Sequence, residues 1–497
     1  MRNKVLITAL LIFIGAGLFA QSEDDRISVE FKNITVSDLI DSVRNISGIK
    51  IAYDVSAIPV DSMVSIKAEN IYPLELLRSV LKNDDLEILD ESGQVIIRKK
   101  IRKAGKYFRI HGKVTGDKGQ PLPWVNISFK NIALGTISNR SGDYEIRIPY
   151  EYSGDSLFFS ALGYGVRGVP VSPKDTLVNV VLDESVITLP EVVIKYKKAD
   201  EIINRFIKNR GKNYFEKKVL FTAFFRETIM QDDKYVNVSE AVLNILKFPY
   251  DKPFQFEYVK FIKGRKYDDV EKMKYVNLKV EGGPYYFSRI DIARYQDFFP
   301  DENGNTLYRY KLKGLDYQYD KLVYVVSFEP YTDTGELLYE GVMRFDASSY
   351  ALVSAELKLS KNTLRKSRKY LIKKESGHIK ARPFYAGYSI SYRPFNGMWV
   401  LNKVIGELKI KITDKKNGNK STFSALSEML YSDFKDAGDL KFRQSEMYRS
   451  NYVLSEKIDS YDPDFWKNYN VIKPGEDIEN VFKKNTLKQD KNKGSSE

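Results

Sequence analysis

The stretch LLYEGVMRFDASSYALVSAELKL, residues 337–359, decides the fold of the larger part of this chain. Its residues alternate between apolar or aromatic and polar side chains, which is the two-residue period of a β-strand. The same Tyr- and Phe-rich alternation recurs in VLFTAFFRE (219–227), LVYVVSFEP (322–330) and MWVLNKVIGELKIKIT (398–413). Long antiparallel strands with one polar face are expected. We therefore predict a large antiparallel β-rich domain over residues 199–482, with a half-barrel as one form of it.

A single amphipathic helix is predicted to open this domain. Its apolar face carries Ala199, Ile202, Ile203, Phe206 and Ile207, and Gly211 is the predicted stop. At the other end, residues 483–497 are rich in Lys, Asn and Ser and are predicted to form a disordered tail.

The preceding residues, 106–184, show short alternating runs separated by turn sequences such as Asp117-Lys118-Gly119 and Ser141-Gly142-Asp143. About seven strands at this spacing predict a seven-stranded β-sandwich. The order GKVTGDKGQPLPWVNISF (112–129), GTISNRSGDYEIRIP (135–149) and LFFSALGY (157–164) resembles the carboxypeptidase regulatory-like domain, a transthyretin-like sandwich. The resemblance implies an accessory fold and no peptidase activity.

A linker is predicted at residues 185–198. Within it, LPEVVI (189–194) resembles the segment that joins such a sandwich to the plug domain in many TonB-dependent receptors of the Bacteroidetes type. The rest of the chain is too short for the plug and the large barrel of a receptor.

A 37-residue repeat lies in residues 21–100. Six of nine matched pairs are identical and two are Ile/Leu exchanges; the pairs are Phe31/Ala68, Asn33/Asn70, Ile34/Ile71, Leu39/Leu76, Ile40/Leu77, Ser42/Ser79, Val43/Val80, Ile49/Leu86 and Ile51/Ile88. Each half predicts a strand, a helix and a strand, so we expect a small α+β domain of βαβ-repeat type with both helices on one face of a small sheet. The halves VSDLIDSV (36–43) and PLELLRSV (73–80) resemble the secretin/TonB short N-terminal (STN) domain. That resemblance implies a periplasmic module that docks proteins of outer-membrane systems.

Residues 1–20 have the three parts of a secretory signal peptide: a basic start, an apolar run from Val5 to Phe19, and small residues before the cut. The chain has no cysteine, which excludes disulfides and thiolate chemistry. The net charge of +13 is spread along the chain, and an exported protein meets little nucleic acid. We expect a periplasmic protein associated with the outer membrane, with its signal peptide cleaved.

The residues give no catalytic set, and we predict that the protein is not an enzyme and has no cofactor and no metal. His111 and His378 lie outside any metal-spacing motif, and Asp301 begins a loop without the acidic residue of a calcium site. The charged residues Arg226, Glu227 and Glu240 lie in apolar strands, where they are expected to pair with each other or to face solvent.

Two surfaces are candidates for binding. A basic cluster that could hold an anionic lipid head group or a partner consists of Lys361, Arg365, Lys366, Arg368, Lys369, Lys373 and Lys374. A solvated strand pair with its turn would explain the same cluster. In the repeat domain, Asp41 and Arg78 are predicted to belong to a docking surface, with a strand edge as the alternative.

The order of the three domains, with FFRETI (224–229) and DPDFWKNYNVIKPGE (462–476), resembles envelope proteins of the Bacteroidetes whose function is not assigned. Our leading hypothesis is a non-enzymatic periplasmic interaction protein, whose partners are outer-membrane or TonB-linked proteins. The alternative is a periplasmic lipid or lipoprotein carrier that uses an apolar curved sheet, because the 337–359 stretch has the strand rhythm of lipoprotein-carrier-like half-barrels. A transmembrane barrel of about a dozen strands is a third possibility.

Overall fold

The computed structural model describes residues 26–53, 58–81, 86–91, 94–99, 107–185, 198–252, 255–268, 283–295, 297–331, 338–367, 378–458 and 465–483. The chain divides into two compact units, Met1–Gly105 and Lys106–Glu497, and each is described by itself. The predicted signal peptide lies outside the described residues, as do residues 186–197 of the predicted linker and residues 484–497 of the predicted tail.

The first unit shows the sequence repeat as a structural repeat. The elements β1 (Ile27–Thr35), α1 (Val36–Ser47) and β2 (Lys50–Tyr53) are repeated by β3 (Met63–Ile71), α2 (Pro73–Val80) and β4 (Leu86–Glu91), and β5 (Gln94–Lys99) follows. The strands form two sheets and not the single sheet that we predicted: β1 pairs with β3, while β5 lies between β2 and β4. The prediction of one sheet is wrong because β1 and β3, the equivalent strands of the two halves, pair only with each other. The strands β2 and β4 are joined instead by β5, which lies outside the repeat.

The pairing of β1 with β3 explains why the repeat retains an asparagine. Asn33 and Asn70 both have positive φ, at 52° and 55°, a conformation that asparagine tolerates better than most residues. The backbone N–H of Asn33 donates to Ser65 Oγ at 2.9 Å, and the backbone N–H of Asn70 donates to Ser28 Oγ at 3.0 Å. The two halves therefore hold each other by the same contact, made once in each direction.

The second unit begins with the sandwich. Its elements are β6 (Tyr107–Gly116), β7 (Asn126–Ser128), β8 (Gly135–Ile137), β9 (Asp143–Pro149), β10 (Ser156–Ser160), β11 (Arg167–Pro170), β12 (Thr176–Leu177) and β13 (Val180–Leu182). Within residues 107–185 these are eight strands in two sheets, one more than the seven predicted. The additional strand, β12, has two residues and is too short to leave an alternating pattern.

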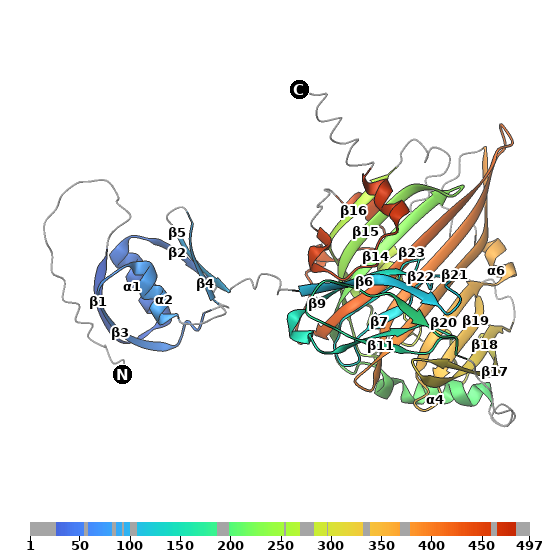
Figure 1. The fold of residues 1–497 in the computed structure, drawn as a ribbon, viewed down its shortest axis with the longest axis horizontal. Helices are drawn as coiled ribbons and strands as arrows, with labels where there is room; N and C mark the ends of the chain where they lie inside the picture. Colours follow the sequence, from blue (N-terminus) through green and yellow to red (C-terminus); the bar gives the residue numbers. More distant parts are fainter. Residues whose placement is uncertain are drawn as a thin grey trace. The chain divides into compact units, whose positions relative to one another are not determined.

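A ten-stranded antiparallel sheet makes up most of the second unit (Figure 1). Its strands are β14 (Val219–Gln231), β15 (Lys234–Lys247), β16 (Tyr258–Asp268), β17 (Tyr308–Gln318), β18 (Lys321–Pro330), β19 (Tyr339–Asp346), β20 (Leu352–Leu359), β21 (Ile379–Phe395), β22 (Met398–Asp414) and β23 (Lys420–Asp436). Their order is β16-β15-β14-β23-β22-β21-β20-β19-β18-β17. In the described part of the chain the sheet is open, with β16 and β17 at its edges. The predicted β-rich, antiparallel character of this region is confirmed.

One face of this sheet, called here the helix-covered face, is packed by α4 (Ala199–Asn213) and by residues 283–295 and 297–300, which start with α5 (Gly283–Phe287). The Phe206 ring of α4 packs in tilted contacts against Phe299 and Phe345, with ring centroids 4.7 and 5.4 Å away. The helix begins where predicted, but it passes through Gly211 and ends at Asn213. It continues because Arg210 and Asn213 are buried and give the last turn tertiary contacts.

The opposite face, called here the groove face, carries the sandwich over β14, β22 and β23. Ile137 of the sandwich joins an apolar cluster with Phe224, Ile405 and Leu430 of the sheet. Residues 465–483 close the same side: Thr136 Oγ1 donates to the carbonyl of Val471 at 3.1 Å. The sandwich and the sheet therefore pack together within one compact unit. The predicted domain boundaries 106–184 and 199–482 stay a prediction.

Candidate binding groove

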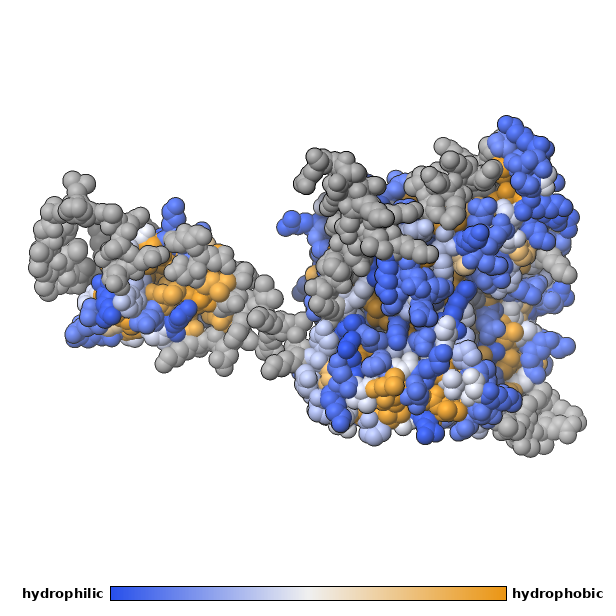
Figure 2. Space-filling view, turned by 45° about the horizontal axis from the view of Figure 1, so that its top comes forward, coloured by the Kyte–Doolittle hydropathy of each residue, from blue (hydrophilic) through white to orange (hydrophobic). Residues whose placement is uncertain are grey.

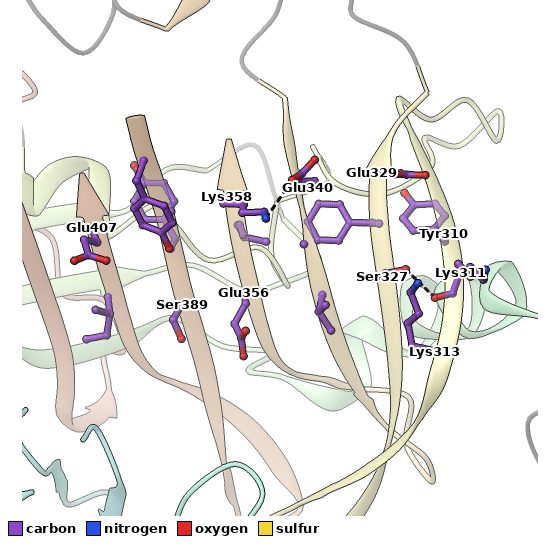
Figure 3. Close-up of a pocket in the computed structure, with 18 of the residues that line it drawn as sticks. Tyr310, Lys311, Lys313, Ser327, Glu329, Glu340, Glu356, Lys358, Ser389 and Glu407 are labelled. Carbon is purple, nitrogen blue, oxygen red and sulfur yellow. Dashed lines mark hydrogen bonds and ion pairs between the residues drawn. The ribbon is translucent and has the colours of Figure 1, made fainter. Parts of the chain in front are cut away.

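A groove of about 1040 Å³ crosses the groove face beside the sandwich. Its floor comes from seven consecutive strands, from β17 at the sheet edge to β23. Neighbouring strands lie about 4.8 Å apart, so the floor is roughly 29 Å long. Figure 3 shows its polar side chains, which include Lys311, Lys313, Ser327, Glu329, Glu340, Glu356, Lys358, Ser389 and Glu407.

Most charges on the floor are already paired. Lys358 Nζ lies 3.3 Å from Glu340, and Arg309 Nε lies 3.1 Å from Glu329. Glu356 is 3.1 Å from Arg344 on the neighbouring strand. Each of these carboxylates thus has a cation beside it, and the pairs are hydrated at the surface of the groove.

Lys311 and Lys313 on the edge strand β17 differ from these residues. Both are exposed and line the groove, and no carboxylate of the described residues forms an ion pair with either. The β17 end of the groove therefore carries positive charge that no carboxylate of the described residues pairs with.

The wall at the other end belongs to the sandwich. Arg140 lies 3.9 Å from Glu407, and the Trp124 side chain donates from Nε1 to Glu428 at 2.8 Å. Trp124 has a φ of 54°, a strained conformation for a bulky residue, and its carbonyl accepts a hydrogen bond from Lys403. Burial lowers the pKa of Lys403 to about 7. These contacts fix the wall relative to the floor.

An aromatic ring covers part of the floor at β21. Gly387 has no side chain, and a Cβ at this position would lie 2.8 Å from the Tyr385 hydroxyl. The Tyr385 side chain therefore extends along the sheet over residue 387, with 37% of the residue exposed. Lys409 lies 5.6 Å from its ring centroid.

The charged strand residues noted in the sequence divide between the two faces. Arg226 and Glu240 form a buried ion pair at 2.6 Å on the groove face, and the Arg226 guanidinium donates to the Ile472 carbonyl at 2.6 Å. Their pairing agrees with the prediction. Glu227 is on the opposite face, its Oε2 has no partner in the described structure, and burial raises its pKa to about 8. These residues are structural and give no carboxylate pair for acid–base chemistry.

The predicted basic cluster is described only in part. Arg365 and Lys366 are exposed on α6 (Lys361–Lys366), a short helix where we allowed for a strand pair and turn; Ser360 caps its first turn through its side chain. Nothing is described of the Lys361 side chain, and Arg368, Lys369, Lys373 and Lys374 lie outside the described residues. The cluster as an anionic-lipid site stays a prediction.

The predicted docking residues of the first unit lie at its surface. Asp41 and Arg78 are both exposed, and Asp41 pairs with Arg44 at 2.7 Å. Their role in docking stays a prediction.

Sequence reasoning missed a buried polar cluster on the helix-covered face. Asp291 accepts hydrogen bonds from Tyr250 and Tyr392, both at 2.8 Å, and pairs with Lys247 at 3.0 Å. Lys247 and Arg294 each lie 3.0 Å from Glu257. The cluster is buried and holds residues 283–295 against the sheet.

Neither a metal cluster nor a membrane-spanning helix is present in the described part of the chain. Within those residues, no group of three or more His, Asp or Glu side chains is arranged to hold a metal ion. None of the helices described has the length and apolar character needed to cross a membrane.

Comparison with known proteins identifies the sandwich. Residues 110–194 match the family model of the CarboxypepD_reg-like domain. The resemblance predicted from residues 112–164 is thereby confirmed for this domain. In the carboxypeptidase regulatory-like domain of this chain, Trp124 and Arg140 form the groove wall. No curated protein matches the sequence.

Three solved structures are similar to about half of the chain. A Vibrio parahaemolyticus domain with the provisional name outer membrane lipoprotein-sorting protein is 12% identical, and the match covers 49% of this chain and 95% of that chain with a TM-score of 0.24. A DUF1329 family protein from Desulfovibrio piger is 10% identical, with coverages of 51% and 100% and a TM-score of 0.24. A LolA superfamily protein from Nitrosomonas europaea is 11% identical, with coverages of 51% and 98% and a TM-score of 0.20.

Proposed function

We propose that this protein is a non-enzymatic binding protein of the bacterial periplasm that holds an extended polar ligand in the groove and docks to a partner at the outer membrane through its first unit. The groove is the observation that carries the proposal. It is large enough for a ligand, since binding sites usually measure about 300 to 1,000 Å³. Most charged side chains of the groove form ion pairs. Among the described residues that line it, we find no nucleophile beside a general base.

The rigid junction of sandwich and sheet supports this function. The groove wall on the sandwich is fixed to the floor by Trp124, Glu428 and Lys403. A preformed groove loses little conformational entropy on binding. Figure 2 shows that hydrophilic residues dominate the described surface in view and that the hydrophobic residues form separate patches. Such a surface suits a protein that binds a polar ligand.

The groove can be tested by filling it. Val342 lines the groove, so Val342→Trp should block it, while Leu440→Trp, at an exposed position outside it, is the matched control. After incubation in an envelope extract, native mass spectrometry of the recovered full chain should show an added mass for wild type and the control but not for Val342→Trp. Bare protein in all three samples would refute ligand binding in the groove.

Docking by the first unit has a separate test. Asp41→Lys and Arg78→Glu in the full chain should leave the melting temperature nearly unchanged, because both residues are exposed, but should weaken capture of outer-membrane or TonB-linked proteins. Leu39→Ala, at a position with no exposed surface, should cost about 2 to 5 kcal/mol and abolish capture by unfolding the unit. Unchanged capture by both charge reversals would rule out the helical surface and leave a strand edge as the candidate.

Lipid or lipoprotein carriage is the second candidate, because the helix-covered face is apolar and aromatic. Phe206, Tyr214 and Phe225 on this side have no exposed surface. A lipid chain could enter only if α4 left the sheet. Native mass spectrometry with added phosphatidylglycerol decides: bound lipid supports carriage, and an unchanged protein mass counts against it.

A further inference from the structure

We propose that the ligand of the groove is an acidic oligosaccharide, with one carboxylate held at Lys311 and Lys313 and a sugar ring lying on Tyr385. This inference rests on the proposed binding function and adds the chemical class of the ligand. It follows from the placement of a cationic edge, a row of paired charges and an exposed aromatic ring along one floor.

The charge distribution places the acidic group of the ligand. Glu329, Glu340 and Glu356 already have a cation at 3.1 to 3.3 Å. Lys311 and Lys313 have no such counterpart among the described residues, so they offer the more favourable place for a carboxylate. Because β17 is an edge strand of the described sheet, this group can also enter from solvent without displacing another strand.

The paired charges favour hydroxyl groups along the rest of the ligand. An ion pair such as Lys358–Glu340 presents a donor and an acceptor side by side, and a sugar hydroxyl can use both without breaking the pair. A second charged group on the ligand would have to compete with one member of each pair. The middle of the groove therefore suits a neutral, hydroxyl-rich chain better than a polyanion.

Tyr385 supplies the apolar contact that a sugar ring needs. Its side chain lies along the sheet over Gly387 and is 37% exposed. The negative face of an aromatic ring attracts the positive edges of C–H groups, and such a contact buries apolar area without an unsatisfied polar group. Tyr385 and Lys311 lie on β21 and β17, about 19 Å apart across the sheet, so the ligand spans several sugar units.

The test is calorimetric binding to the full chain. The probes are chitohexaose oxidised at its reducing end to the aldonic acid, which carries a single carboxylate, a hyaluronan hexasaccharide, in which every second sugar carries one, and neutral chitohexaose. We expect the better acidic oligosaccharide to bind at least ten-fold more tightly than chitohexaose, and its affinity to fall as salt is raised. Equal affinities for acidic and neutral sugars, or no binding of either acidic sugar, would overturn the proposal.

Variants assign the contacts. The double change Lys311→Glu/Lys313→Glu should weaken acidic-sugar binding at least ten-fold, and Tyr385→Ala several-fold for both acidic and neutral sugars. The double change Lys380→Glu/Lys420→Glu, at two exposed lysines of the sheet outside the groove, is the charge-matched control and should bind as wild type does. Unfolding curves of each variant exclude loss of structure, and wild-type affinity in the double variant would overturn the assignment.

Hexaglutamate separates the two classes of acidic ligand. If this peptide binds more tightly than either acidic sugar, the ligand of the groove is an acidic peptide and not an oligosaccharide. That result would overturn the inference. If the envelope extract still loads the groove while no acidic sugar binds, the proposed function stands and this inference alone fails.

Discussion

The two faces of the ten-stranded sheet use the same kinds of ion pair for opposite purposes. On the helix-covered face, Lys247, Asp291 and Arg294 are buried; Lys247 pairs with Asp291 at 3.0 Å, and Arg294 pairs with Glu257 at 3.0 Å. On the groove face beyond the sandwich, Lys358 and Glu340 keep 56% and 35% of their side chains exposed. Removing one partner of a buried pair leaves an uncompensated charge, whereas water replaces the partner of a hydrated pair. Burial therefore makes the first set structural and leaves the second set available to a ligand.

Asp291→Ala should give the largest effect on stability. The change removes the acceptor of two tyrosine hydroxyls and a partner of Lys247, and breaking such a buried pair costs about 3 to 5 kcal/mol. Denaturant unfolding of the full chain measures the loss. A cost below about 1 kcal/mol would show that the cluster is not held as described.

Glu227→Gln should change how stability depends on pH. Burial raises the Glu227 pKa from its ordinary value of 4.5 to about 8. Between these values the unfolded chain ionises the carboxyl and the folded chain does not, so stability falls as pH rises from about 4.5 to about 8. Thermal melts should show a smaller loss over this range for Glu227→Gln than for wild type, because glutamine does not ionise. Parallel curves would mean that Glu227 is hydrated.

Trp124→Phe tests the contact between the sandwich and the groove face of the sheet. Phenylalanine keeps an aromatic ring but cannot donate to Glu428. Loss of a hydrogen bond to a charged group costs about 1.5 to 3 kcal/mol. Unfolding curves should move by this amount, and the groove should lose affinity for its ligand because its wall is less firmly held. No change in either measurement would indicate that Lys403 and the apolar cluster hold the junction without Trp124.

Glu340→Ala should give the smallest effect. Its pair with Lys358 is hydrated, and such surface pairs contribute about 0.2 to 1 kcal/mol. The melting temperature should barely change, while ligand affinity falls. A loss as large as that of Asp291→Ala would remove the distinction between the two faces.

The strands could be predicted because their periodicity is local. In β19 and β20 the apolar residues alternate with polar ones, and that pattern is visible directly in the sequence 337–359. In β14 nearly every residue is buried on both faces, and its apolar VLFTAFF indicates a covered strand without indicating what covers it. The sandwich supplies that cover, and no local pattern encodes contact between Ile137 and Phe224.

The sites were harder to predict for the same reason. The groove collects side chains from seven strands of the sheet, and an exposed Lys or Glu in an alternating strand is the ordinary occupant of a polar face. Asp291 lies in a short irregular segment, and its partners Tyr250 and Tyr392 are 41 and 101 residues away. Trp124 could have been noticed in the sequence, because it is a bulky residue in the turn-rich segment PLPWV (121–125). In the structure it has a positive φ and lines the groove.

The pairing of the first strand of the sheet with the last has a consequence for the order in which the chain can fold. β14 lies between β15 and β23, and Thr228 of β14 donates to the carbonyl of Leu426, 198 residues later. Thr136 of the sandwich donates to Val471, 335 residues downstream. Contacts at such separations form slowly and only after synthesis of the distant segment. The first unit, whose repeat pairs residues close in sequence, can fold as soon as its own residues emerge. The second unit must stay without its central pairing until almost the whole chain has been made.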